Sequence, residues 1–277
     1  MNIAIITDST SDVPYDLAQK HDIHIVPNIV VIEGKSVEDN PSFSRQKFYE
    51  QLPQMQTPPT TAAASAGVFQ MLYEKLFAQG VSHIISIHAS SLLSGIFNAA
   101  SLAAQAFEGR VHVVDSEQVS LGLGFQALAA AEAAARGLPL QAVLDCIADV
   151  RKRVRVVAML DTLEYVRRSG RVSWLRASLG SLLNVKLFVE IKDGLVQRLG
   201  EVRTRGKGIA RLLELLHTLE PLERLAILHT NAEVEARQIL AAVQTRLSAA
   251  PLVVNVTTVI GAHVGPNGLG FAVVVAQ

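Results

Sequence analysis

Short apolar runs alternate with amphipathic stretches along the first half of the chain. Three runs rich in Ile and Val predict buried strands, because β-branched residues in runs of this length favour strands: IAIIT (3–7), SHIISIH (82–88) and VHVVDS (111–116). Stretches with helical spacing cover about 15–21, 42–52, 66–80, 96–107 and 120–135. Strands that alternate with helices indicate βαβ units, and therefore a parallel sheet with helices on both faces.

Two further segments complete this half. DIHIVPNIVVIEG (22–34) predicts a strand, and QTPPTTAAASAGV (56–68), rich in Pro, Thr and Ala, predicts an exposed crossing loop. Ligands of such sheets bind beyond the carboxyl ends of the strands, so polar clusters at those ends are the first indication of a site. The clusters are Asp8–Ser11, Ser90–Ser94 and Asp115–Ser116.

The second half has a different pattern. Apolar runs at 154–160, 186–204 and 224–230 predict strands, and the segments 209–220 and 231–248 predict helices. The KDG sequence at 192–194 predicts a hairpin turn, and residues 253–276 predict two strands joined by a glycine-rich loop that carries His263. We expect an α/β fold with two domains: an N-terminal parallel-sheet βαβ domain (1–150) and a C-terminal α+β domain with a mixed or antiparallel sheet (151–277), the ligand site lying between them.

Composition narrows the class of protein. The 277 residues include 25 Lys and Arg against 25 Asp and Glu, a formal net charge of zero, so general attraction to nucleic acid has no support. The single Cys146 excludes a disulfide scaffold. The most apolar stretch, 121–135, is interrupted by Gln126 and Glu132, so we expect no membrane span. The first residues lack the basic region of a signal peptide, and we expect a cytoplasmic protein.

Two motifs carry candidate chemistry. SSLLSG (90–95) precedes a predicted helix, where hydroxyls and free backbone N–H groups suit a carboxylate or a phosphate; Ser94 acting only as a helix cap is the alternative. GAHVGPNGLG (261–270) places His263 on a glycine-rich segment, where the imidazole can donate to an oxyanion or satisfy a backbone carbonyl.

Other polar residues are less distinctive. Thr60, Thr61 and Ser65 can cap the following helix or present hydroxyls to a ligand. The segment 151–186 is basic, with nine Lys or Arg residues against two acidic ones, and fits a solvated face, an acidic protein partner or nucleic acid. The eight His lack metal-binding spacing, so we expect no metal and no cofactor.

Seven motifs together resemble the DegV family of bacterial fatty-acid-binding proteins, which includes the FakB subunits of fatty acid kinase. They occur in the family's order and span nearly the whole chain: ITDSTSDVP (6–14), TAAAS (61–65), SSLLSG (90–95), VVDSEQVSLGLG (113–124), DTLEYVRRSGRVS (161–173), VRTRGKG (202–208) and GAHVGPNGLG (261–270).

The resemblance implies a binding protein rather than a catalyst. It implies a buried long-chain fatty acid, expected to be C14–C18, whose carboxyl group is held by Thr61, Ser94, His263 and the backbone N–H of Gly95. It also implies a partner, an ATP-dependent fatty acid kinase subunit that phosphorylates the bound carboxyl group. Arg171 and Arg203 match positions linked to docking of that kinase.

The chain departs from the family pattern at two positions. Ala62 stands where a Ser is common, and Ile96 stands where a Thr is common, so we expect fewer head-group contacts and a branched apolar group beside the carboxylate. Three alternatives stay open: an esterase that uses Ser94 and His263, a His-based carbonyl or phosphoryl-transfer enzyme resembling dihydroxyacetone kinase, and an interaction module with an adventitious lipid.

Overall fold

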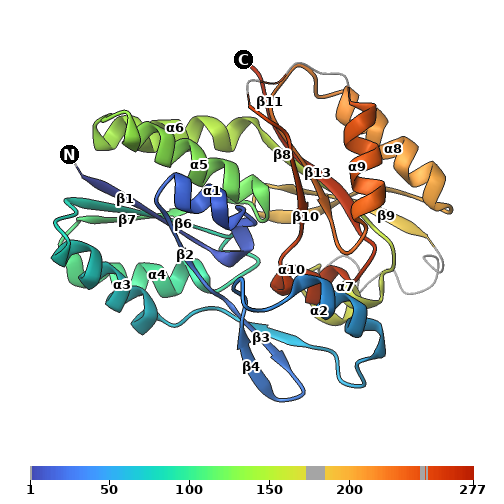
Figure 1. The fold of residues 1–277 in the computed structure, drawn as a ribbon, viewed down its shortest axis with the longest axis horizontal. Coiled ribbons are helices and arrows are strands. Elements are labelled where there is room, and N and C mark those ends of the chain that lie inside the picture. Colours follow the sequence, from blue (N-terminus) through green and yellow to red (C-terminus); the bar gives the residue numbers. More distant parts are fainter. Residues whose placement is uncertain (1, 173–184, 244–246, 248) are drawn as a thin grey trace.

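A computed structural model describes residues 2–172, 185–243, 247 and 249–277 (Figure 1). Its first half contains a parallel sheet with the strand order β2-β1-β6-β7. The strands are β1 (Ile3–Asp8), β2 (Ile23–Val26), β6 (His83–His88) and β7 (Val111–Asp115). The predicted parallel βαβ arrangement is therefore confirmed.

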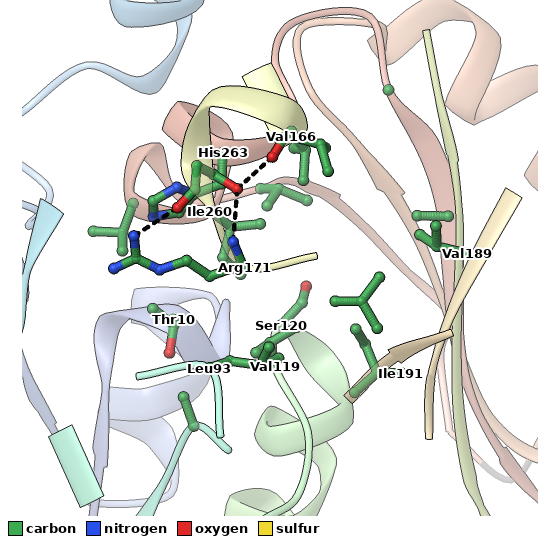
Figure 2. A pocket seen from close by; sticks show the side chains of 18 of the residues that line it. Thr10, Leu93, Val119, Ser120, Val166, Arg171, Val189, Ile191, Ile260 and His263 are labelled. Atoms are coloured by element: carbon green, nitrogen blue, oxygen red, sulfur yellow. Dashed lines mark hydrogen bonds between the residues drawn. The ribbon is translucent and has the colours of Figure 1, made fainter. Parts of the chain in front are cut away.

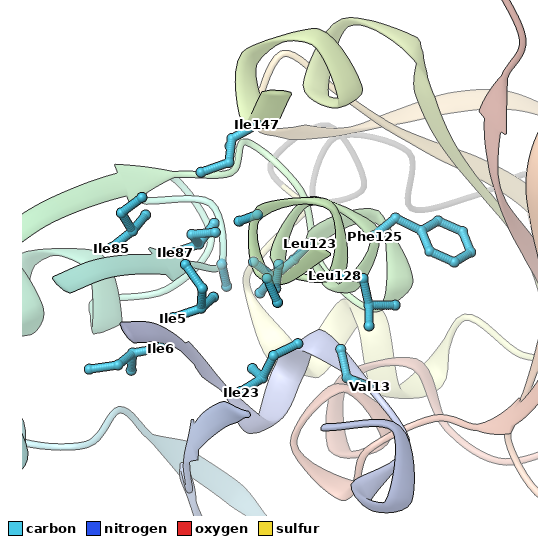
Figure 3. Packing of buried hydrophobic residues seen from close by; sticks show 14 of the residues in the cluster. Ile5, Ile6, Val13, Ile23, Ile85, Ile87, Leu123, Phe125, Leu128 and Ile147 are labelled. Carbon is cyan, nitrogen blue, oxygen red and sulfur yellow. The ribbon is translucent and has the colours of Figure 1, made fainter. Parts of the chain in front are cut away.

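Helices cover both faces of this sheet, as Figure 1 shows. These helices are α1 (Tyr15–Lys20), α3 (Ala66–Ala78), α4 (Ile96–Ala104), α5 (Leu121–Ala135) and α6 (Leu140–Arg153). Helix α5 is buried nearly all round because it also packs on the second sheet. A Cβ on Gly122 would lie 2.5 Å from the Val156 side chain, so only glycine permits this close approach. Figure 3 shows Ile5 and Ile87 of the sheet packed beside Leu123 of α5.

The second sheet has six strands in the order β10-β9-β8-β13-β11-β12. The strands are β8 (Val154–Leu160), β9 (Lys186–Lys192), β10 (Leu195–Val202), β11 (Leu222–His229), β12 (Leu252–Asn255) and β13 (Leu269–Val275). Only β11 and β12 pair in parallel, so the sheet is mixed, as predicted. Its outer face carries α8 (Arg205–His217) and α9 (Glu233–Ala242).

The hairpin between β9 and β10 turns at Asp193 and Gly194, as the KDG motif predicted. Both residues have positive φ, 51° and 74°, as a two-residue turn between twisted strands requires. Helix α6 ends at Arg153 and β8 begins at the next residue, so no linker separates the two halves there.

The strand predicted for 22–34 is present but interrupted, and the exposed loop predicted for 56–68 is wrong in part. Pro27 divides the first into β2 and β3 (Ile29–Ile32), and β3 leaves the parallel sheet. It forms a separate three-stranded sheet, in the order β4-β3-β5, with β4 (Lys35–Glu38) and β5 (Thr60–Ala62). The second segment therefore contains a strand, which antiparallel pairing with β3 stabilises and which its own composition does not favour.

The glycine-rich segment near the C-terminus was also predicted wrongly. Residues Thr258–Val264 form helix α10 rather than a strand and a loop, so His263 lies in a last helical turn. Tertiary contacts override the β-branched composition here. Asp39 accepts hydrogen bonds from the hydroxyls of Thr257 and Thr258 at the helix start.

Short helices complete the described part of the chain. They are α2 (Arg45–Gln51), α7 (Glu164–Ser169), and the 3₁₀ turns η1 (Ser9–Ser11), η2 (Leu52–Gln54) and η3 (Gln105–Phe107). Helices α2 and α7 both contact α10. Arg176 of the basic segment, and the end of the helix predicted to reach residue 248, lie outside the described residues. Within the part of the chain described, no helix is long and apolar enough to cross a membrane.

Candidate functional site

A cavity of about 220 Å³ lies where the two sheets, α10 and the start of α5 meet (Figure 2). Most of its lining side chains are apolar. They include Leu93, Val119, Val156, Val166, Val189, Ile191, Val196, Val259, Ile260 and Val264. A concave, apolar site with few polar groups is the usual form of a small-molecule site.

Small residues hollow out the wall formed by the six-stranded sheet. Directly paired residues on four adjacent strands form one row across the cavity, in the order Val189, Ala158, Gly270, Leu228. The two central residues are the smallest, so the row forms a trough between Val189 and Leu228. A Cβ on Gly270 would lie 2.4 Å from the backbone oxygen of Val157, so strand packing also requires the glycine.

The polar end of the cavity is formed by Thr61 and His263. Pairing with Val30 places Thr61 on β5, and α10 carries His263. The Thr61 hydroxyl and the His263 Nε2 are hydrogen-bonded at 2.9 Å. Burial, aided by the positive charge of Arg171, lowers the pKa of His263 to about 4. The imidazole is therefore neutral near pH 7 and acts as a hydrogen-bonding group rather than a counter-charge.

Ser94 and Gly95 line the same cavity, so the four predicted ligand-binding residues are brought together. The Ser94 hydroxyl accepts a hydrogen bond from the backbone N–H of Ile96, the first residue of α4, at 3.3 Å, while Gly95 occupies the N-cap position. Among the described residues, no histidine is hydrogen-bonded to Ser94. The esterase alternative therefore lacks the serine–base pair it requires.

The two predicted docking arginines occupy different places. Arg171 is exposed, lines the cavity near His263 and donates to the backbone oxygen of Ser169 at 2.8 Å. Figure 2 shows its side chain beside that of His263. Arg203 is exposed directly after β10 and does not line the cavity.

The two departures from the family pattern have unequal consequences. Ala62 lines the cavity, so the site lacks the hydroxyl that a Ser at this position would supply. The expectation for Ile96 was wrong: its side chain is fully buried in the main hydrophobic core and does not line the cavity. The first turn of α4 directs this side chain toward the core rather than toward the ligand site.

Six polar lining residues were not singled out from the sequence as ligand-binding: Thr10, Asn28, Ser120, Ser169, His229 and Thr230. The Asp8–Ser11 cluster was the available signal, since Asp8 positions two of them. Its carboxylate accepts hydrogen bonds from the Thr10 backbone N–H at 3.0 Å and from the Asn28 side chain at 3.1 Å. Burial opposes ionisation of Asp8, but hydrogen bonds from His88 and Thr10 outweigh it and lower the pKa.

Asp8 also ends a buried chain with the connectivity of a hydrolase triad. The Ser86 hydroxyl lies 2.7 Å from His88 Nε2, and His88 Nδ1 lies 3.0 Å from the Asp8 carboxylate. All three side chains are fully buried, and the Tyr73 hydroxyl donates to Ser86 at 2.9 Å. A nucleophile must be reached by its substrate. These three hydrogen-bonded side chains therefore stabilise the core and do not form an active site.

The described residues contain no group of three or more side chains that could hold a metal ion. In the remaining polar cluster, the Asp115 side chain is hydrogen-bonded to backbone N–H groups. Its carboxylate accepts from the N–H groups of Ser91 and Glu117, and neither Asp115 nor Ser116 lines the cavity.

Comparison with known proteins gives one consistent family. The model of the DegV family, described as uncharacterised proteins, matches residues 2–276. Protein DegV of Bacillus subtilis is 33% identical over 98% of both chains, and a DegV domain-containing protein of Streptomyces coelicolor is 34% identical over 98% of both.

Solved structures agree with this result. A DegV family protein from Thermus thermophilus, described by its fatty acid binding, has a TM-score of 0.91 and 32% identity over the whole of both chains. DegV from Bacillus subtilis, described as a fatty acid binding protein, has a TM-score of 0.87 and 32% identity over the whole of both chains.

Proposed function

This chain belongs to the DegV family, and from that premise we propose that it binds one long-chain fatty acid in the cavity between its two sheets. The observation that carries the proposal is a mainly apolar cavity in which Thr61 and His263 form a neutral, hydrogen-bonded pair. An amphipathic ligand with one small polar head and a long apolar tail matches this distribution of groups.

The carboxyl group is placed against Thr61, Ser94, the N–H of Gly95 and His263. A buried carboxylate without partners would be costly or would take up a proton. Hydroxyls, a backbone N–H and an imidazole supply hydrogen bonds without a fixed ion pair, which leaves an oxygen free to attack a phosphoryl donor. The nearby Arg171 supplies a favourable positive field at the same end.

The acyl chain is placed along the trough of Ala158 and Gly270. Each buried methylene contributes about 0.8 kcal/mol, so a chain of C14–C18 contributes on the order of 10 kcal/mol before ordering costs. Affinity then comes mainly from the tail, while the head group sets the orientation.

The proposed partner is an ATP-dependent kinase subunit that phosphorylates the presented carboxyl group. Arg171 at the cavity and Arg203 beyond β10 are both exposed and offer positive charge to an acidic partner surface. In this role the chain itself is a substrate-presenting protein in the cytoplasm and supplies no catalytic residue.

The primary test is mass spectrometry of lipid extracted from the purified protein, compared with native mass. Near-stoichiometric fatty acid is the expected result, and its length and unsaturation identify the ligand. A protein that is isolated empty and takes up neither palmitate nor oleate would refute the proposal.

A second test locates the acyl chain. Ala158→Leu fills the trough and should reduce palmitate binding far more than binding of decanoate, because a longer chain needs the filled volume. Leu199→Ala, at an exposed position of β10 away from the cavity, is the control. Equal loss for both ligands would mean that the tail does not follow this wall.

A further inference from the structure

Helix α10 belongs to a hydrophobic cluster separate from the main core. The cluster joins β3, α2, α7 and α10, and we call it the α10 cluster; its buried members are Val30, Phe48, Tyr49, Leu52, Tyr165, Val259 and Ala262. Side chains of α10 also form one wall of the cavity, among them Ile260 and His263. Movement of this cluster would therefore open the cavity.

The α10 cluster is attached to the N-terminal sheet through a polar contact at Asp12. The Asp12 carboxylate accepts from the Thr257 backbone N–H at 2.7 Å and from Arg45 at 3.0 Å. It also accepts from the hydroxyl of Ser120, the residue just before α5, at 2.7 Å. Arg45 and Thr257 lie on the side of the α10 cluster, whereas Asp12 and Ser120 lie on the side of the parallel sheet.

Keeping this contact closed is costly when the Asp12 carboxylate is ionised, because its charge is buried. The Asp12 side chain is fully buried, and burial raises its pKa to about 6 although Arg45, Ser120 and Thr257 oppose the shift. The other charged and titratable groups that face it are Asp39, which raises the pKa further, and Tyr49, whose own pKa is raised well above the usual value by burial and by Asp12. Tyr15 of α1 lies in the field of Asp39 and Arg45.

We infer that the α10 cluster is the gate of the cavity and that the Asp12 carboxylate keeps this gate easy to open. Separation of Thr257 and Arg45 from Asp12 admits water to the carboxylate and removes the cost of its burial. A polar contact is cheaper to open than an apolar one, because water replaces its hydrogen bonds. Opening of the gate would let the ligand exchange. Only this last step rests on the proposed function.

Linkage gives the direction of the pH effect. The closed state holds a proton on Asp12 more tightly than a hydrated open state, in which the pKa is near the ordinary 3.8. The Asp12 contribution therefore favours the closed gate on acidification and should lower the opening constant about tenfold between pH 7.5 and pH 5.0. His263 of α10 contributes with the opposite sign, because burial lowers its pKa to about 4 and hydration on opening would restore it. The Asp12 contribution is therefore the difference in pH dependence between the unaltered protein and Asp12→Asn.

The test is hydrogen exchange of the α10 amides, which include those of Gly261 and Gly265, at the two pH values after correction for intrinsic rates. Asp12→Asn keeps the shape and tolerates the left-handed φ of 56° at this position. It should lower the opening constant at pH 7.5 by at least about tenfold and remove the Asp12 contribution to the pH dependence. Asp16→Asn, an exposed change of equal charge on α1, should behave as the unaltered protein.

A second variant has the opposite expected sign. Arg45→Gln removes the cation that favours ionised Asp12 and should raise the opening constant at pH 7.5. A merely structural role predicts that both variants loosen α10. An opening constant in Asp12→Asn equal to or above that of the unaltered protein would overturn the inference. If Asp12→Asn does not fold, the pH dependence of Arg45→Gln decides it. Loss of the cation raises the pKa of Asp12 further, so the ratio of the opening constants at pH 7.5 and pH 5.0 should exceed that of the unaltered protein. An unchanged or smaller ratio, or tighter α10 amides, would refute the inference.

Palmitate release to an acceptor vesicle of phosphatidylcholine supplies the functional readout. Release should be slower from Asp12→Asn and faster from Arg45→Gln at pH 7.5. If the unaltered protein takes up no palmitate, the proposed function fails, while the exchange of the α10 amides still decides the gate.

Discussion

Replacement of Thr61 by Val tests whether the polar end of the cavity recognises a carboxyl group. The change removes the hydroxyl that lies 2.9 Å from His263 Nε2 and keeps the shape of the side chain. A hydrogen bond to a charged group contributes about 1.5–3 kcal/mol, so palmitate affinity should fall roughly 10- to 150-fold. The apolar tail contributes about 12 kcal/mol for fifteen methylene or methyl groups, so weakened binding should remain measurable.

His263→Gln should weaken palmitate binding to a similar extent. The double variant should lose less than the sum of the two single losses, because directly hydrogen-bonded groups are energetically coupled. Isothermal titration calorimetry with palmitate and with hexadecanol, which has the same chain and an uncharged head, measures both effects. Equal weakening for the alcohol and the acid would refute the reasoning, since the pair would then contribute to cavity shape rather than to carboxylate recognition.

Three further outcomes are expected. Gly261→Ala should lower the melting temperature by several degrees, because a Cβ would lie 2.2 Å from the Tyr49 hydroxyl, whereas Gly206→Ala in α8, with open space around it, should not. Arg203→Ala should leave palmitate affinity unchanged and reduce acyl-phosphate formation with a cognate kinase, and unchanged transfer would refute docking at this position. Burial and Arg171 hold the pKa of His263 near 4, so the unfolded state takes up this proton first. His263 therefore costs stability as the pH falls from 6.5 to 4, by at most about 3 kcal/mol. Urea titrations without ligand should show that the free energy of unfolding falls less on acidification in His263→Gln than in the unaltered protein, by up to this amount.

The sequence by itself determined that the first sheet is parallel and that a second, mixed or antiparallel sheet follows it, but not the three-stranded sheet. Regular spacing of Ile- and Val-rich runs encodes strands locally, and a helix between consecutive strands leaves a parallel arrangement as the simple solution. The KDG turn is equally local, because Asp193 and Gly194 tolerate positive φ wherever they occur. Thr61, Ser94 and His263 were recognised from motifs, and the fold brings them to one cavity.

Only the tertiary structure decided how these residues are held. The segment before His263 has the β-branched composition of a strand, yet it is a helix because Asp39 and Tyr49, more than 200 positions away, bind its first turn and the residues before it. The family pattern likewise placed Ile96 beside the carboxylate, whereas packing directs it into the core.

The raised pKa of Asp12 also has no local signature. It arises from burial, which outweighs the opposing effects of Arg45, Ser120 and Thr257 from three other segments of the chain. Periodicity and turn residues act over a few positions, so a sequence reveals them directly. Desolvation and the geometry of a shared cavity depend on which distant segments meet, and that is determined only when the chain folds.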